Sequence, residues 1–196
     1  MKTTFILHGG ESGRDNEHDK KFYRSWVESF DENFVPKILL IYFSRKPEEY
    51  DNLYQQDTER FAKYNDNRKA NFEIASQDLE KLRQQIKKSD VIYVRGGSSE
   101  LLLEKIKPLG NELAELIQGK VYVGSSAGVI LISKYARSAS SNRWKEGLGL
   151  LPIVSVVHWS SAFQEALDKF KAENKENDFE YILVPETEFV IKKFEI

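Results

Sequence analysis

Short apolar runs alternate with amphipathic segments along most of the chain. The runs are rich in valine, isoleucine, leucine and aromatic residues and are too short for buried helices, so each predicts a strand. The predicted strands cover residues 3–8, 37–43, 71–74, 90–94, 120–124 and 150–157. Continuous apolar runs of this kind are typical of strands that are buried on both faces.

The segments between these runs predict helices. Phe22, Trp26 and Phe30 recur at every fourth position, which predicts a helix within 19–30. Further helices are predicted over 47–69, with Pro47 in the first turn, over 79–88 after a capping segment at 76–78, and over 98–109. Strands alternating with helices predict an α/β fold: a three-layer, doubly wound and mostly parallel sheet with helices on both faces. Without a visible linker or repeat, we expect one domain over 1–196.

Composition and charge exclude several classes of partner and functional site. The 196 residues are 40% hydrophobic, enough for a substantial core, and 29 basic against 31 acidic residues leave a net charge of −2. With no basic stripe, we do not expect a nucleic-acid partner. The absence of cysteine excludes disulfides, thiolate metal ligands and a cysteine nucleophile. No apolar run approaches the ~20 residues that span a bilayer, so we expect a cytoplasmic protein without a membrane partner.

The segment 124–128, Gly-Ser-Ser-Ala-Gly, follows a predicted strand and precedes another apolar run. Small residues at such a place permit a sharp strand-to-helix corner, the nucleophile elbow, with Ser126 at its tip. Ligands of parallel sheets bind at the carboxyl ends of strands, where Gly96 and Gly97 also lie. The same pattern also suits a tightly packed turn or a phosphate-binding turn, so the pattern alone does not decide whether Ser126 is catalytic.

A serine nucleophile needs a base, and histidine is the usual one. The chain has three histidines, His8, His18 and His158. His8 ends the first predicted strand near the expected pocket, and we expect His18 to be a surface residue. His158 lies at the carboxyl end of a strand downstream of Ser126 and is the predicted general base. The three histidines lack metal-ligand spacing, so we expect no metal and no cofactor.

Taken together, these motifs resemble peptidase family S51. The matching elements are ILHGG at 6–10, KILLIYFS at 37–44, DVIYVRGGSSELL at 90–102 and the Ser126 turn, followed by one histidine after the next apolar strand. The family includes dipeptidase E and cyanophycinase, on a fold similar to class I glutamine amidotransferases and, more broadly, flavodoxin-like. The resemblance implies Ser126 as the nucleophile, His158 as the base, and the backbone amides of Gly97 and Ala127 as the oxyanion hole.

The third member of the triad follows from the same resemblance. In dipeptidase E the acid is an aspartate between serine and histidine, and here that segment contains no aspartate and one acid, Glu146. In cyanophycinase the acid is a late glutamate, and ILVPETEF at 182–189 has Glu186 at that position. We therefore predict a triad of Ser126, His158 and Glu186, with Glu146 and Glu188 as alternatives.

The resemblance implies a small peptide as the substrate, and an Asp-containing dipeptide is one candidate. Arg95, Gly96 and Ser98 are the predicted substrate-binding residues, although the family's arginine after the histidine is missing here. Other cations that could replace it are Lys134, Arg137 and Arg143. The leading hypothesis is a serine-type peptidase that works through an acyl-enzyme on Ser126. The alternative is a catalytically silent binding or regulatory module of the same fold. The sequence leaves open whether the protein is a monomer or a homodimer.

Overall fold

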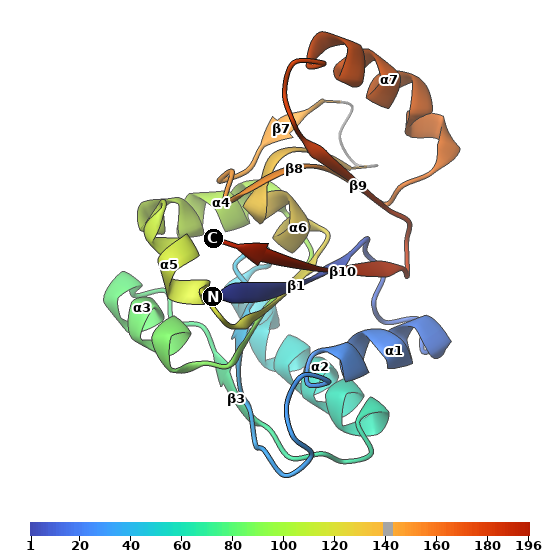
Figure 1. The fold of residues 1–196 in the computed structure, drawn as a ribbon. Helices are drawn as coiled ribbons and strands as arrows, with labels where there is room; N and C mark the ends of the chain where they lie inside the picture. The colour runs from blue at the N-terminus through green and yellow to red at the C-terminus, as the bar shows by residue number, and fades with distance from the viewer. Residues whose placement is uncertain (139–142) are drawn as a thin grey trace.

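The structure, a computed structural model, describes residues 1–138 and 143–196. Its central sheet has six strands: β1 (Lys2–His8), β2 (Lys37–Ile41), β3 (Asn71–Ile74), β4 (Val91–Val94), β5 (Val121–Ser125) and β10 (Phe189–Glu195). The strand order is β10-β1-β5-β4-β2-β3, and every pairing is parallel except that of β10 with β1 (Figure 1). The carboxyl ends of β1, β5, β4 and β2 therefore meet at one edge of the sheet.

Helices cover both faces of this sheet. They are α1 (Glu17–Ser25), α2 (Tyr50–Tyr64), α3 (Leu79–Lys88), α4 (Ser99–Ile106), α5 (Glu112–Ile117) and α6 (Ala127–Ile132), with short 3-10 turns at Pro47–Glu49 and Lys107–Leu109. Side chains alternate across a strand: Ile38 and Leu40 of β2 pack with α1 and α2, whereas Leu39 and Ile41 pack with α3 to α6. The predicted three-layer α/β fold is confirmed. No helix within the described residues is long and apolar enough to cross a membrane.

A second sheet, which the sequence analysis did not predict, follows α6. It contains β6 (Ser133–Arg137), β7 (Lys145–Glu146), β8 (Leu151–Val157) and β9 (Glu180–Val184) in the order β7-β6-β8-β9. A 3-10 turn (Ser161–Phe163) and α7 (Gln164–Glu173) connect β8 to β9. The predicted strand at 150–157 exists, but it belongs to this second sheet, which extends from the central one at the orange and red end of the chain (Figure 1).

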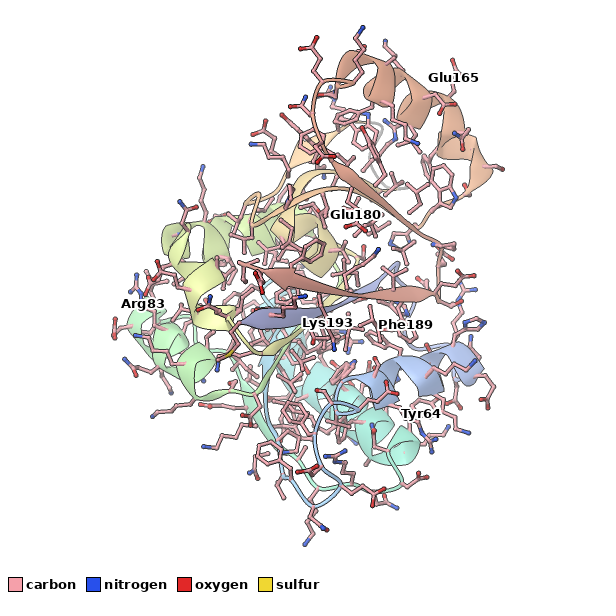
Figure 2. All side chains as sticks on the ribbon, in the orientation of Figure 1. Tyr64, Arg83, Glu165, Glu180, Phe189 and Lys193 are labelled. Atoms are coloured by element: carbon pink, nitrogen blue, oxygen red, sulfur yellow. The ribbon has the colours of Figure 1, made fainter. Side chains whose placement is uncertain are left out.

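The first helix is shorter than its apolar stripe predicts. It ends at Ser25, whose hydroxyl donates to the carbonyl of Phe22 at 2.6 Å and so offers that carbonyl a partner within the last turn. Phe22 is fully buried and packs against Phe189 of β10, with ring centroids 5.7 Å apart. Figure 2 labels Phe189. Trp26 is also buried, just past the helix end. The stripe therefore correctly identified two buried positions and one partly buried position, Phe30, although not the helix boundary.

Candidate active site

Ser126 lies at the corner between β5 and α6. Its backbone has φ 45° and ψ −95°, a conformation that is strained for any residue except glycine. The corner is possible because the residues two positions before and after it, Gly124 and Gly128, lack side chains. A Cβ on Gly124 would lie 2.8 Å from the carbonyl carbon of Gly128, and a Cβ on Gly128 would lie 2.6 Å from the carbonyl oxygen of Val94. The small residues of the segment thus allow a helix to start directly against the sheet.

The structure brings Ser126, His158 and Glu186 together. His158 follows β8 and has φ 54°, and its Nε2 lies 3.0 Å from the Oγ of Ser126. Its Nδ1 lies 3.2 Å from Oε1 of Glu186. With the proton of the neutral ring on Nδ1, the serine hydroxyl donates to Nε2 and Nδ1 donates to the carboxylate. This is the arrangement that a general base and its orienting acid require.

The alternative acids lie elsewhere. Glu146 is an exposed residue of β7, paired across the strands with Tyr135. Glu188 is exposed, and its backbone carbonyl accepts a hydrogen bond from Gly9. It is Glu186, therefore, whose carboxylate occupies the position beside the imidazole.

Arg14 is a neighbour of Glu186 that the sequence analysis missed. It donates to Oε2 of Glu186 at 3.0 Å, so the glutamate faces His158 with one oxygen and Arg14 with the other. The Nε of Arg14 also lies 3.5 Å from Glu11. Both members of the Arg14–Glu186 pair are about half exposed, so this ion pair orients the carboxylate more than it stabilises the fold.

The two predicted oxyanion-hole residues border the Ser126 corner. Ala127 is the first residue of α6, where backbone amides lack partners within the helix. Gly96 faces the serine closely: a Cβ built on Gly96 would lie 3.3 Å from the Cβ of Ser126. Gly97, the next residue, has φ 155°, and a Cβ there would lie 2.4 Å from the carbonyl oxygen of Ser44. Gly96 therefore lets backbone lie close to the serine, and Gly97 lets backbone lie close to Ser44.

A polar pocket of about 370 Å³ opens beside the Ser126–His158 pair. It contains the predicted residues Arg95 and Gly96, whereas Ser98 lies outside it and caps α4 by accepting from the amide of Leu101 at 3.3 Å. The other cations considered, Lys134, Arg137 and Arg143, do not line it. The lining residues are Gly10, Glu11, Ser12, Gly13, Arg14, Arg45, Arg60, Arg95, Gly96, Gly97, Ser125, Ser126 and His158.

Arg45, Arg60 and Arg95 form the cationic wall of this pocket. Arg95 pairs with Asp57, a fully buried carboxylate of α2 that also accepts from the hydroxyl of Tyr42 at 2.9 Å. Arg60 lies 4.0 Å from the same carboxylate. The Nε of Arg45 donates to the carbonyl of Gly96 at 2.8 Å. Among the described contacts, the guanidinium of Arg45 pairs with no carboxylate. Two guanidinium groups thus share one carboxylate and the third faces none, so the wall has a surplus of positive charge.

Arg95 was predicted to bind substrate, and Arg45 carried a similar signal that sequence reasoning could have used. Arg45 follows the strand at 37–43 and Arg95 follows the strand at 90–94, so both lie where parallel strands end. Arg60 is different, because it comes from the middle of α2 and nothing in its local sequence indicates a pocket.

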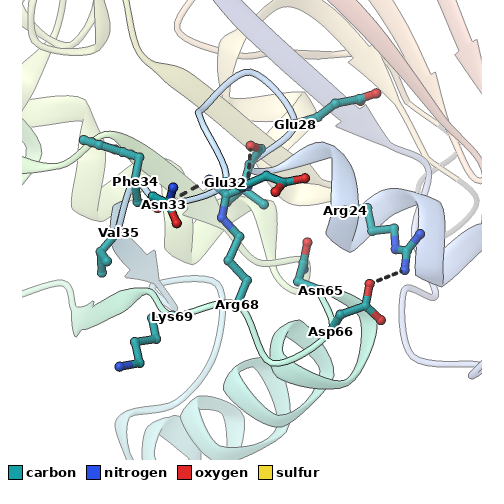
Figure 3. A pocket seen from close by; sticks show the side chains of 11 residues that line it. Arg24, Glu28, Glu32, Asn33, Phe34, Val35, Asn65, Asp66, Arg68 and Lys69 are labelled. Atoms are coloured by element: carbon teal, nitrogen blue, oxygen red, sulfur yellow. Dashed lines mark hydrogen bonds and ion pairs between the residues drawn. The ribbon is translucent and has the colours of Figure 1, made fainter.

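A larger pocket, of about 640 Å³, lies at the other end of the sheet, beside the segment that enters β2 (Figure 3). Its two arginines are engaged: Arg24 pairs with Asp66 at 2.7 Å, and Arg68 donates to carbonyls that include those of Val27 and Asp31. It contains no serine, histidine or cysteine. The chemistry of the chain therefore favours the smaller pocket. Among the described residues, no group of three or more His, Cys, Asp or Glu side chains is placed to hold a metal ion.

Replacement of Gly10 with alanine is expected to reduce catalysis. Gly10 has φ 129°, and a methyl group there would lie 2.1 Å from Cε1 of His158. A displacement of the imidazole by about 1 Å can lower kcat by roughly 10²-fold. Steady-state kinetics would measure the effect.

Gly110→Ala is the matched control. Gly110 also has a positive φ, 51°, but its nearest neighbour would be 3.9 Å from the new methyl group. It should lose stability through backbone strain and retain kcat. Equal kcat values for the two variants would contradict the packing of Gly10 against His158.

Stability should fall in acid because His8 is buried. Burial, then the nearby His158 and His18, lower the pKa of His8 to about 4, while the backbone of Thr187 acts weakly in the opposite direction. Between the unfolded pKa near 6.5 and about pH 4, the unfolded chain binds a proton at His8 that the folded chain does not. Stability is therefore lost as the pH falls through this range, by about 3 kcal/mol in total. Urea unfolding from pH 7 to 4, compared with His8→Asn, would isolate this contribution; parallel curves would contradict it.

Comparisons with known proteins identify relatives of this chain. At 28% identity, the uncharacterized peptidase Lin0382 of Listeria innocua aligns with 61% of this chain and 67% of its own length. Lmo0363, an uncharacterized peptidase of Listeria monocytogenes, is 29% identical over 52% of this chain and 56% of its own.

Solved structures show the same fold. A peptidase from an acI-B1 actinobacterium superposes with a TM-score of 0.66 at 20% identity, over 98% of this chain and 84% of its own. A candidate peptidase E protein from Listeria monocytogenes gives a TM-score of 0.59 at 19% identity, over the full length of both chains. The model of peptidase family S51 matches residues 5–193, nearly the whole sequence. The resemblance drawn from the motifs is confirmed, and the chain belongs to peptidase family S51.

Proposed function

We propose that this member of the family is a serine-type peptidase that cleaves short peptides through an acyl-enzyme on Ser126. The observation that carries the proposal is the continuous hydrogen-bonded chain from the Ser126 hydroxyl through His158 to Glu186, at a strained strand-to-helix corner. Strain of this kind persists where the surrounding structure enforces it, and it is characteristic of functional sites.

The chemistry follows from the positions of these atoms. Nε2 of His158 takes the proton of Ser126 as Oγ attacks the peptide carbonyl, and the developing oxyanion is stabilised by the amides of Gly97 and Ala127. The imidazolium then protonates the leaving amine, the C–N bond breaks, and an ester remains on Ser126. Water, deprotonated by His158, attacks this ester and releases the acid. Glu186 stabilises the imidazolium in both halves of the reaction.

The pocket supports an acidic substrate. Its volume, about 370 Å³, suits a small ligand and not a long peptide. Carboxylates form charge-assisted, often bidentate hydrogen bonds with arginine. The wall of Arg45, Arg60 and Arg95 could therefore bind either an acidic side chain or a terminal carboxylate, and an Asp-containing dipeptide offers both. In this proposal these arginines bind the substrate carboxylate in place of the family's arginine after the histidine, which this chain lacks.

A serine-directed fluorophosphonate tests the catalytic part of this proposal. We expect one adduct, mapped by mass spectrometry to Ser126, that disappears in Ser126→Ala and in His158→Ala. An unmodified wild-type chain would contradict the proposal and favour a catalytically silent binding module.

The preference for an acidic substrate is tested by comparing hydrolysis of the dipeptides Asp-Leu and Ala-Leu, with Ser126→Ala as the blank. Arg45→Gln should raise KM for Asp-Leu by roughly tenfold and leave Ala-Leu hydrolysis little changed, as loss of one charged hydrogen bond implies. Arg83→Gln, a change on α3 where arginine pairs with Glu112 (Figure 2), is the matched control. Equal effects of Arg45→Gln on the two dipeptides would contradict acidic recognition by the wall.

A further inference from the structure

Each triad residue lies at or next to a left-handed backbone position. Ser126 has φ 45°, His158 has φ 54°, and Thr187, which follows Glu186, has φ 65°. Residues other than glycine pay about 1–2 kcal/mol for such conformations, so the surrounding structure must hold them. The three segments come from different elements, β5, β8 and the turn before β10, and need a common anchor.

That anchor is the end of β1. The amide of Ser126 donates to the carbonyl of His8 at 2.9 Å, that of His158 donates to Gly9 at 3.0 Å, and that of Thr187 donates to Gly10 at 2.8 Å. Three consecutive carbonyls therefore bind the amides of the three left-handed residues. Any change in the backbone at 8–10 would move the serine, the imidazole and the carboxylate relative to one another.

The side chain of His8 fixes this turn. Its imidazole is fully buried, and Nδ1 accepts a hydrogen bond from the amide of Gly10 at 3.0 Å. The ring also packs against Phe22 of α1, with centroids 4.4 Å apart. An acceptor at Nδ1 requires the neutral ring with its proton on Nε2. The Gly10 that it holds has φ 129° and contacts the ring of His158.

We infer that His8 is a positioning residue of the active site: as a neutral imidazole protonated on Nε2, it locks the 8–10 turn whose carbonyls align Ser126, His158 and Glu186. It touches no reacting atom and acts through the backbone. This inference rests on the proposed serine-peptidase function, and it adds to Arg14 a second side chain outside the triad on which the geometry of the triad depends.

Two replacements of His8 test the role of its acceptor. His8→Asn can place an amide oxygen near the position of Nδ1, whereas His8→Leu keeps apolar volume and leaves the amide of Gly10 without a partner. We expect the leucine variant to lower kcat by about 10- to 100-fold with KM changed less than about twofold, because the reacting groups are misaligned by a fraction of an ångström to 1 Å. The asparagine variant should recover most of kcat.

Gln85→Leu is the control for lost stability alone. Gln85 is a buried residue of α3 that accepts from the amide of Ser76 at 2.7 Å, in a turn remote from Ser126. It should lower the melting temperature and leave kcat unchanged. A His8→Leu variant that keeps wild-type kcat, or an asparagine variant that is no better than leucine, would overturn the positioning role.

Two further measurements separate the possible failures. If the wild-type chain takes up no fluorophosphonate at Ser126, the proposed function fails and this inference fails with it; if it is labelled and His8→Leu is labelled as fast, only the inference fails. If both His8→Leu and His8→Asn unfold, ¹⁵N-¹H long-range NMR of the wild-type imidazoles still tests the inference, because it shows which nitrogen of His8 is protonated. The inference requires His8 to be neutral with its proton on Nε2 at pH 7, and a proton on Nδ1 would overturn it.

Discussion

Ser126→Ala is expected to lower kcat/KM by about 10⁴- to 10⁶-fold, the range found when a triad nucleophile is removed. The hydroxyl is the atom that lies 3.0 Å from Nε2 of His158, and no methyl group can replace it as a nucleophile. Hydrolysis of Asp-Leu by purified protein measures the loss, with the exposed Ser29→Ala as the control. Retention of more than a few per cent of the activity would remove Ser126 from the mechanism.

Ser126→Gly should be equally inactive and yet more stable than the wild-type chain. Glycine adopts φ 45° without the strain that serine carries there, which is worth about 1 kcal/mol or more. Urea unfolding at pH 7 measures the gain, and Ser126→Ala should show none, because alanine has the same Cβ. A less stable glycine variant would contradict the idea that the corner stores strain for function.

Glu186→Gln is expected to lower kcat by about 10²- to 10⁴-fold with little change in KM, because an amide cannot stabilise the imidazolium or select the ring tautomer as a carboxylate does. The change also removes one of the two ionic partners of Arg14; this exposed ion pair contributes little to stability. The melting temperature should therefore change by no more than a few degrees.

The other candidate acids supply the matched controls. Glu188→Gln and Glu146→Gln change exposed residues, whereas the carboxylate in contact with Nδ1 of His158 is that of Glu186, so both should retain wild-type kcat. If Glu188→Gln proves as damaging as Glu186→Gln, the assignment of the orienting acid must be revised.

Several features of the site could be predicted because their signals are local. The serine corner depends on small residues within 124–128, and His158 directly follows a run that reads as a strand. Glu186 was not predictable in this way: its position came from the resemblance to cyanophycinase, and the 3.2 Å contact with His158 joins residues 28 apart. Arg14 and Arg60 were missed because nothing beside them in the chain identifies the pocket that they enter.

The sequence by itself determined the α/β class, the buried strands, the corner at Ser126 and the family, since hydrophobic periodicity and small-residue turns act over a few neighbouring positions. Tertiary structure alone decided that 150–157 joins a second sheet, that four arginines line one pocket, and that the carbonyls of His8, Gly9 and Gly10 bind three distant amides. The physical reason is that these contacts depend on which segments the parallel crossovers bring to the same sheet edge. The sequence pattern of a few neighbouring residues carries no information about such long-range arrangements.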